Sequence, residues 1–340
     1  MRPRLKDELV TLAHGAGGKA TRALVEQLFL EELSNPLLDP LGDSALLELN
    51  GSRLAFTTDS YVVTPIVFPG GDIGELAVNG TVNDLAVAGA RPVALSAGFV
   101  IEEGFEVARL RELAASMARA AERAGVPVAT GDTKVVERGK ADGLYVNTAG
   151  LGVVPPGVEL GAGRVRVGDR VLVSGTLGDH GMAVMIARGE LQLEVELESD
   201  TAPVHELTAS LLELGGEVRW LRDPTRGGLA TALNELAQEA GVAVALDEAS
   251  LPLRPAVVGA CEILGIDPLY VANEGKLVAV VAPQAADDAL ARLRAHDLGA
   301  EAALIGEIRP EPEGLVVLDT AFGGGRIVDM LVGDPLPRIC

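Results

Sequence analysis

Residues 72–101, DIGELAVNGTVNDLAVAGARPVALSAGFVI, place a run of small residues directly before a largely apolar segment. Asp72–Ala88 predicts a helix, and Pro92–Ile101 predicts a buried strand. Glu106–Ala124 is an amphipathic pattern stopped by Gly125, which predicts a second helix. Around these elements the pattern predicts a helix over about 20–33 and strands over 9–13, 45–49, 53–58, 126–129 and 143–154. Helices mixed with several consecutive strands favour an α+β fold over a regular doubly wound sheet.

The domain organisation follows from length and from one proline-rich stretch. A chain of 340 residues can hold two hydrophobic cores. Pro155-Pro156-Gly157 is a stiff sequence and predicts a boundary between a first α/β domain over 1–155 and a second over 156–329. The second half predicts helices over 181–188, 204–214, 228–240, 255–264 and 285–296, and strands over 170–174, 242–246, 277–282 and 303–308. Residues 330–340 predict a flexible tail.

Charge and hydropathy exclude several classes of partner. The formal net charge is −21, from 28 Lys and Arg against 49 Asp and Glu. Such a surface repels phosphate backbones, so neither nucleic acid nor an anionic membrane is an expected partner. No uncharged run reaches the length of a bilayer span, and the first ten residues have no apolar signal core. These features predict a cytoplasmic protein.

A glycine-rich turn, His14-Gly15-Ala16-Gly17-Gly18-Lys19, lies between a predicted extended segment and a predicted helix. Its glycines allow backbone N–H groups to approach a phosphate at a helix start. The spacing is not that of a Walker A loop, which needs glycine at 13 and a hydroxyl residue at 20. A flexible surface turn explains the motif equally well.

Five aspartates follow or end apolar segments beside small residues: Asp43, Asp59, Asp84, Asp132 and Asp223. Each alone is most often a turn or cap residue. Asp84 lies inside a helix, where caps do not occur. Carboxylates near a glycine-rich loop suit magnesium bound to nucleotide phosphates. We favour metal binding for Asp84 and Asp59 and leave it open for Asp43 and Asp132.

Two further motifs precede elements of the second half. Asp223-Pro-Thr-Arg226-Gly-Gly228 leads into a helix, where an arginine and a helix start suit an anion; a plain helix cap is the alternative. Asn273-Glu274-Gly275-Lys276 precedes a strand and, taken alone, is an ordinary turn.

The two cysteines differ in context. Cys261 and its apolar neighbours follow one another at helical spacing, and this pattern predicts that Cys261 lies in the core. Cys340 is the last residue, and core packing does not explain it. A thiol at a free chain end can reach into another active site, and an exposed thiol kept there without use is an oxidation liability.

Together these segments resemble the HypE family of hydrogenase maturation proteins, within the PurM-like superfamily of aminoimidazole ribonucleotide synthetase. The resemblance rests on motifs in the same order along the chain, of which the terminal one is specific to HypE: HGAGGK, GDSA, TTDS, VNDLAVAGARP, ATGDTKVV, DPTRGGLA, NEGK and PRIC. It implies a homodimer that binds ATP and Mg²⁺ in a cleft. It also implies partners: HypF loads a carbamoyl group onto the terminal thiol, and a HypC–HypD complex receives cyanide for iron.

The resemblance also implies roles for individual residues. The glycine-rich loop, with Gly15, Gly17, Gly18 and Lys19, covers the nucleotide. The residues implied to bind metal and phosphate are Asp43, Asp59, Asp84 and Asp223, and Asp132 and Arg226 are also implied to contact the nucleotide. Lys134 and Glu274 act near the carboxamide, and Cys340 carries it. ATP then converts the S-carbamoyl group to a thiocyanate. Two alternatives stay open: a PurM-like small-molecule kinase or synthetase, and a non-enzymatic thiol carrier.

Overall fold

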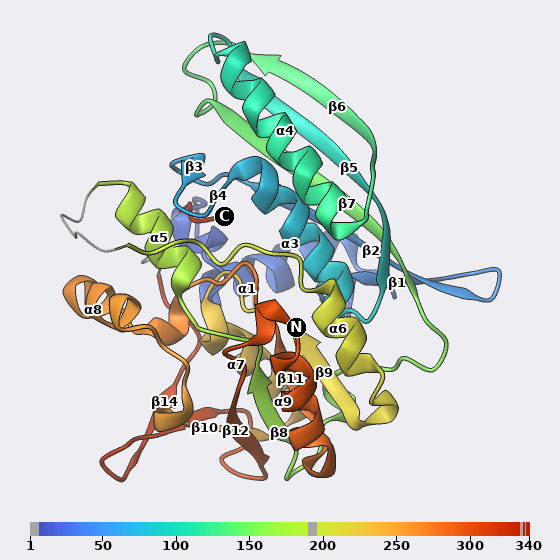
Figure 1. Ribbon diagram of the computed structural model, residues 1–340, viewed down its shortest axis with the longest axis vertical. Coiled ribbons are helices and arrows are strands. Elements are labelled where there is room, and N and C mark those ends of the chain that lie inside the picture. The colour runs from blue at the N-terminus through green and yellow to red at the C-terminus, as the bar shows by residue number, and fades with distance from the viewer. Residues whose placement is uncertain (1–6, 190–195, 334–335, 337) are drawn as a thin grey trace.

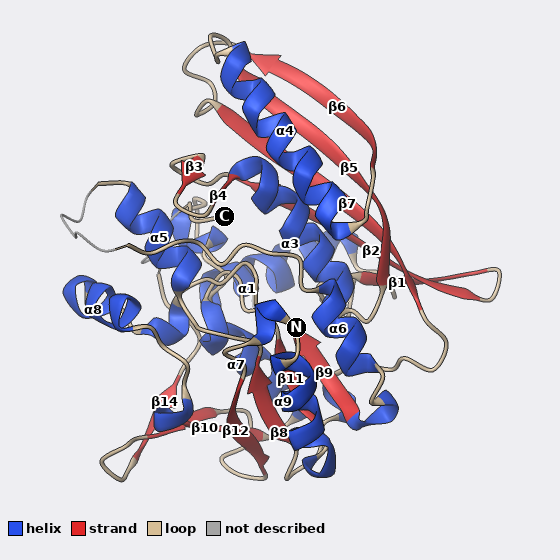
Figure 2. Cartoon of the chain, in the orientation of Figure 1, coloured by secondary structure: helices blue, strands red, loops and turns tan. Residues whose placement is uncertain are grey.

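The computed structural model describes residues 7–189, 196–333, 336 and 338–340, and Figures 1 and 2 show that its strands form two separate groups. The first sheet has five strands in the order β1-β2-β7-β5-β6. Their bounds are β1 Ala45–Leu49, β2 Ser52–Tyr61, β5 Arg91–Glu102, β6 Val128–Val136 and β7 Leu144–Val154. Only β5 and β6 pair in parallel, across helix α4, and the other neighbours are antiparallel. A small β3–β4 hairpin, Val67–Phe68 and Gly71–Asp72, precedes α3.

Two helices lie against one face of this sheet, as the opening sequence predicts (Figure 1). Helix α3, Ile73–Val87, starts at Asp72, whose side chain accepts from the N–H groups of Gly74 and Glu75. Its small residues allow close packing: a Cβ on Gly80 would lie 2.1 Å from the Tyr61 hydroxyl. Helix α4, Val107–Ala124, ends at Gly125 in the left-handed conformation, φ 64°. Helix α3 is buried almost all round because it also contacts the second half of the chain.

The second sheet has seven strands in the order β14-β13-β10-β12-β8-β11-β9. Their bounds are β8 Arg170–Val173, β9 Val218–Arg222, β10 Ala243–Asp247, β11 Val278–Val281, β12 Ala303–Arg309, β13 Val316–Asp319 and β14 Gly325–Val328. Its helices are α5 Asp179–Ala187, α6 His205–Leu212, α7 Gly228–Ala240, α8 Pro255–Leu264 and α9 Ala286–Arg294. Short 3₁₀ turns lie at Leu12–Gly15, Ala162–Arg164, Gly215–Glu217, Glu248–Ser250, Pro268–Tyr270, Pro283–Ala285 and Asp297–Gly299. The mixture of sheets and helices is the α+β architecture that the sequence predicts.

The N-terminal segment is not one regular helix, and it packs on the second half of the chain. The predicted helix over 20–33 is built from α1 Lys19–Leu24, a π-helical turn over Val25–Phe29 and α2 Leu30–Leu33. Arg22 of α1 donates to Gln238 of α7, so this segment packs on the second half of the chain. The predicted strand over 9–13 is a coil and a 3₁₀ turn, because Thr11 and His14 bond to each other.

The described part of the tail is docked, and the flexibility that the sequence predicts for residues 330–340 stays a prediction. Leu336 and Ile339 are each 5% exposed and join the core that contains Tyr61 and Val63. Figure 1 places the C-terminus beside the β3–β4 hairpin and α5. Pro335 and Pro337 lie outside the described residues. Within the described ranges, no helix is long and apolar enough to cross a bilayer.

Candidate active site

Three carboxylates meet where α3, the segment before β1 and the end of β9 converge. Asp43, Asp84 and Asp223 each offer an oxygen, and these oxygens lie within 4.8 Å of one another. The Thr57 hydroxyl donates to Asp84 Oδ2 at 2.6 Å. Arg222 Nη1 lies 2.9 Å from Asp43 Oδ1. Residues 180 positions apart in the sequence therefore form one acidic cluster, which we call the acid trio.

The acid trio is electrostatically incomplete without further positive charge. Burial raises the pKa of Asp84 and Asp223 well above the usual range, and the neighbouring carboxylates raise both further. Burial also raises the pKa of Asp43 to about 6, although Arg222 opposes it. Hard oxygen donors that repel one another are the set that a divalent cation such as Mg²⁺ would stabilise.

Two more acidic groups and a cation face the same region. Tyr61 and Asp59, both on β2, are joined by a hydrogen bond of 3.2 Å from the hydroxyl to Oδ2. Burial raises the pKa of Asp59, and the Arg226 charge opposes that rise. Burial, followed by the charges of Asp223 and Asp200, raises the pKa of Glu274 well above its usual range. Among the described residues, Glu274 Oε1 has no hydrogen-bond partner.

The Asn273–Lys276 motif is not the ordinary turn that it resembles in isolation. Glu274 is 3% exposed and is held through its main chain: Asp200 Oδ1 accepts from its N–H at 3.1 Å, and Asn83 of α3 donates to its carbonyl at 3.0 Å. A Cβ on Gly275 would lie 1.8 Å from Asp200 O. Lys276 Nζ lies 3.2 Å from Asp200 Oδ2. The motif fixes the Glu274 carboxyl beside the acid trio.

The glycine-rich loop packs on the segment after β9. A Cβ on Gly17, φ 78°, would lie 2.7 Å from Arg226 O, and one on Gly18 would lie 2.2 Å from Leu331 O. Arg226 Nη1 in turn donates to Gly15 O at 3.1 Å. The N–H groups of Gly17 and Lys19 donate to Thr21 Oγ1 and Leu331 O, so in this arrangement they are bound to protein acceptors. The Lys19 ammonium pairs with Asp329.

The chain end reaches this region through main-chain hydrogen bonds. Val62 N donates to Cys340 O at 3.2 Å, and Thr64 N donates to Arg338 O at 3.0 Å. The last residues therefore lie alongside the segment that follows β2. A cavity of about 170 Å³ is lined by Cys340, Arg226, Gly15 and Ser60, among others. The charge of Cys340 is the largest influence that raises the pKa of Arg226, with Asp59 and Glu274 adding to it. The Arg226 guanidinium therefore interacts electrostatically with Cys340 and with the carboxyls of Asp59 and Glu274.

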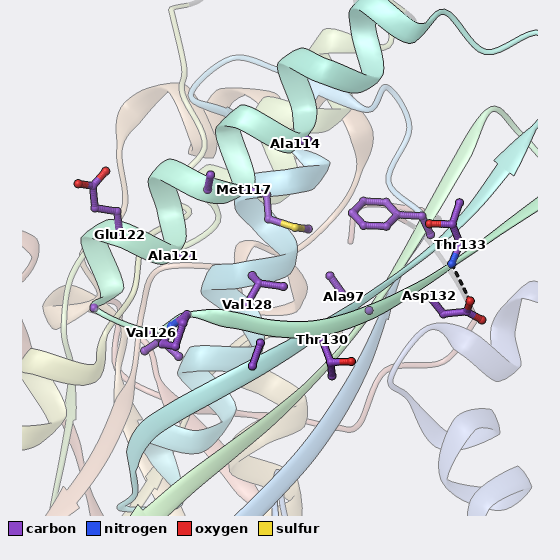
Figure 3. A pocket seen from close by; sticks show the side chains of 16 residues that line it. Ala97, Ala114, Met117, Ala121, Glu122, Val126, Val128, Thr130, Asp132 and Thr133 are labelled. Carbon is purple, nitrogen blue, oxygen red and sulfur yellow. Dashed lines mark hydrogen bonds between the residues drawn. The ribbon is translucent and has the colours of Figure 1, made fainter.

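Asp132 and Lys134 are not brought to this site within one chain. They lie on β6, 71% and 70% exposed, and pair with each other at 3.3 Å. The sheet register aligns Ser60 of β2 with Asp132 through Asn147 and Gly98. That row spans three interstrand steps, about 14 Å. Figure 3 shows Asp132 instead near a separate open cavity of about 970 Å³ between α4 and β6, with Thr133 N donating to its Oδ1.

Comparisons with known proteins show which family the chain belongs to. Residues 41–154 match the N-terminal domain of the AIR synthase related protein family, and residues 166–319 match its C-terminal domain. A carbamoyl dehydratase HypE of Rhodobacter capsulatus is 58% identical over 339 residues, 99% of each chain. The chain belongs to the HypE family of carbamoyl dehydratases.

Solved HypE structures share this fold. A HypE structure in complex with ATP is 45% identical, with a TM-score of 0.82, and the match covers 98% of this chain and 100% of that one. The HypE chain of a HypE–HypF complex is 46% identical, with a TM-score of 0.87, covering 91% of this chain and 100% of that one. The family resemblance read from the sequence motifs is confirmed.

Several residues of this HypE-family site escape a reading of the sequence. Tyr61 and Arg222 lie on strands β2 and β9, where they occur within ordinary alternating patterns. Their one sequence signal is proximity to a motif aspartate: Arg222 directly precedes Asp223, and Tyr61 follows Asp59 by two residues. Thr57 belongs to the TTDS motif, but the sequence predicts no role for it. His180 of α5 and Arg188, the residue that follows α5, contact the tail and lie in no recognised motif.

Proposed function

We propose that this chain uses ATP and Mg²⁺ to dehydrate an S-carbamoyl group on its own Cys340 to S-thiocyanate. The observation that carries the proposal is the docked chain end: Val62 N donates to Cys340 O, and Cys340 lies beside Arg226, whose guanidinium also feels the charges of Asp59 and Glu274. Membership of a family of carbamoyl dehydratases supports the reaction class, and the relative solved with ATP supports the nucleotide.

In this reaction the carboxamide oxygen attacks the γ-phosphorus of ATP, and the bond from that phosphorus to the bridging oxygen breaks to release ADP. The amide nitrogen loses one proton as the phosphorylated imidate forms. The C–O bond then breaks, inorganic phosphate leaves with the oxygen, and loss of the second N–H proton leaves S–C≡N. Phosphorylation is needed because an amide oxygen is a poor leaving group.

The residues near Cys340 fit these steps. Asp43, Asp84 and Asp223 would hold Mg²⁺, which would offset the phosphate charge in a protein of net charge −21. Asp59 would join them on the nucleotide side. The Arg226 guanidinium orients the chain end and stabilises negative charge there. Glu274 is the proposed base for the N–H protons, because a carboxyl with a raised pKa is a stronger base once ionised.

We also propose a homodimer in which Lys134 of the partner subunit completes the site. Within the described part of the chain, one face of the first sheet has no helix against it, and Phe56 and Leu151 lie side by side on that face, 47% and 37% exposed. Apolar neighbours of this size favour burial against a second surface. Asp132 and Lys134 lie on the same open face, at the outer strand β6. A second copy bound to this face would bring its Lys134 to the carboxamide. The chain's own Lys134 does not reach it, because β6 lies three strands away from β2.

The partners proposed for this chain are HypF, which loads the thiol, and a HypC–HypD complex, which removes cyanide. The relative solved as a HypE–HypF complex supports the first. A cytoplasmic location suits an ATP-dependent enzyme with a reduced thiol.

Mass spectrometry of the C-terminal peptide tests the function directly. After incubation with HypF, a carbamoyl donor and ATP, the wild-type peptide should gain a cyano group on Cys340. Cys340→Ala should gain nothing and still bind ATP, and a variant with a few residues added after Cys340 should be loaded but not dehydrated. An ATP-dependent soluble product with an unmodified tail would favour the kinase alternative, and a stable carbamoyl adduct without ATP hydrolysis would favour the carrier.

A further inference from the structure

Helix α5 and Arg188, the residue that follows it, bind the tail through the tail's main chain. His180 Nε2 lies 2.6 Å from Ile339 O, and Arg188 Nη2 donates to Arg338 O at 2.8 Å. Arg188 Nε also donates to Thr64 O at 2.7 Å, so one guanidinium joins the tail to the segment after β2. The two contacts precede the thiol by one and two residues.

The hydrogen-bond network around His180 assigns its proton. Ile339 O can only accept, so His180 Nε2 at 2.6 Å carries the ring proton, and the Ser199 hydroxyl, which accepts from Thr201 N at 3.1 Å, donates to Nδ1 at 2.7 Å. Burial lowers the pKa of His180, which keeps the ring neutral. Phe68 meets the ring edge-on, with centroids 5.4 Å apart, and fixes its plane.

We propose that His180, Arg188 and Ser199 form a clasp that positions Cys340 for dehydration and must open before a partner enzyme can load the thiol. The inference rests on the proposed function. His180 is a positioning residue, because it touches the tail carbonyl and not the reacting atoms. A neutral, fully buried imidazole aimed at the penultimate carbonyl has no other visible task in the site.

The clasp predicts opposite effects on two steps that the tail serves. Dehydration needs the docked tail, whereas loading needs the tail withdrawn. Loss of the His180 hydrogen bond should shift the equilibrium toward withdrawal by about tenfold, the usual effect of one buried hydrogen bond. A residue that only stabilised α5 would lower both rates together with Tm.

Alkylation of the thiols measures docking without ATP or a carbamoyl donor. Cys340 is labelled with iodoacetamide and followed by peptide mass spectrometry, with Cys261 as the internal reference. Cys261 is 1% exposed, and burial raises the pKa of its thiol to about 12. A change confined to Cys340 thus reports the tail, and a change at both reports unfolding.

A matched pair of variants separates the hydrogen bond from the packing. The amide nitrogen of His180→Gln can stand at the position of Nε2, whereas that of His180→Asn is too short to reach Ile339 O. His180→Asn should raise Cys340 alkylation about tenfold, raise loading by HypF and lower single-turnover dehydration, while His180→Gln stays near wild type. Ser199→Ala, the milder variant, should move all three readings in the same directions by a smaller factor.

Equal alkylation in His180→Asn, Ser199→Ala and wild type would overturn the clasp. So would parallel losses of loading and dehydration that track Tm. If the variants change alkylation as expected but the wild type forms no thiocyanate, the clasp stands and the proposed function fails. If thiocyanate forms at the same rate in all variants, the function stands and the clasp fails.

Discussion

The acid trio and strand β6 hold the same kinds of side chain in opposite environments. Burial raises the pKa of Asp84 well above the usual range, whereas backbone and lysine hydrogen bonds lower that of the exposed Asp132. The acid trio is assembled within one chain. Lys134, on β6, is exposed and lies away from that cluster. Under the proposed function, one chain would therefore supply the metal ligands, and the partner subunit would supply the lysine.

The largest expected effect is at the acid trio. Asp84→Asn should weaken Mg²⁺-dependent ATP binding by about 100-fold, because it removes one of the three carboxylates of the cluster. The same change should raise Tm without Mg²⁺, since it removes a buried group that its neighbours repel. Isothermal titration calorimetry with and without chelator, together with a melting curve, checks both.

Asp72→Asn is the matched control for Asp84→Asn, because it changes the same residue type on the same helix. Asp72 caps α3, and asparagine caps nearly as well. Unchanged ATP binding in Asp84→Asn, or a loss shared equally by both variants, would contradict the assignment of Asp84 to the nucleotide site.

The second prediction tests whether strand β6 acts across a dimer. Lys134→Ala and Glu274→Ala homodimers should each bind ATP and form little thiocyanate. A mixed dimer of the two, co-expressed with different tags and purified on both, retains one intact site if Lys134 serves the partner subunit. It should recover about half of the wild-type yield, since one of its two sites is native.

The mixed dimer separates the two arrangements cleanly. If Lys134 served its own chain, each site of the mixed dimer would carry one substitution and the yield would stay at the level of the single variants. A mixed dimer of Lys134→Ala with Lys134→Ala, carrying the same two tags, controls for the purification.

How far the sequence reaches is clearest from individual elements. Helices α7 and α8 have the predicted bounds, because Gly241, Pro255 and Gly265 mark their ends with local backbone preferences. Strand β6 is predicted to end at Ala129 but continues to Val136. It is the exposed outer strand, so alternation between a buried and an open face is missing from residues 130–136. Strands β9, β13 and β14 also went unpredicted.

The site shows the same division. The motifs single out Asp84 and Asp223, because an aspartate within a helix or before a Pro-Thr turn is visible locally, whereas for Asp43 the local pattern leaves metal binding open. They do not reveal that Lys134 lies three strands from β2, since strand order is a long-range property. The Asn273–Lys276 motif resembles a surface turn because its burial comes from Asp200 and Asn83, both distant in sequence.

A third, smaller effect concerns the open face of the first sheet. Phe56→Asp places a charge beside Leu151 on the proposed dimer surface, and should shift the protein toward monomer in size-exclusion chromatography with light scattering. ATP binding should persist, while thiocyanate yield should fall toward that of Lys134→Ala. Arg111→Asp on α4, away from that face, is the control. A variant that stays dimeric would place the interface elsewhere.

The smallest effect is a pH dependence of stability that the acid trio should impose and strand β6 should not. The folded-state pKa of Asp43 is about 6, above its unfolded value, so its contribution to stability is present at low pH and is lost as pH rises between about 4 and 6. Asp43→Asn removes that titration. The Tm difference between wild type and Asp43→Asn, measured in chelator, should therefore move by a few degrees in favour of the variant across this interval, and Mg²⁺ should cancel the trend by holding the ionised form. Asp132→Asn should show no such rise, because that carboxyl is exposed and its pKa is lowered rather than raised. If the difference curve for Asp43→Asn is flat from pH 4 to 6, Asp43 titrates as an ordinary surface acid. The acid trio would then not need a cation to offset repulsion between its carboxylates.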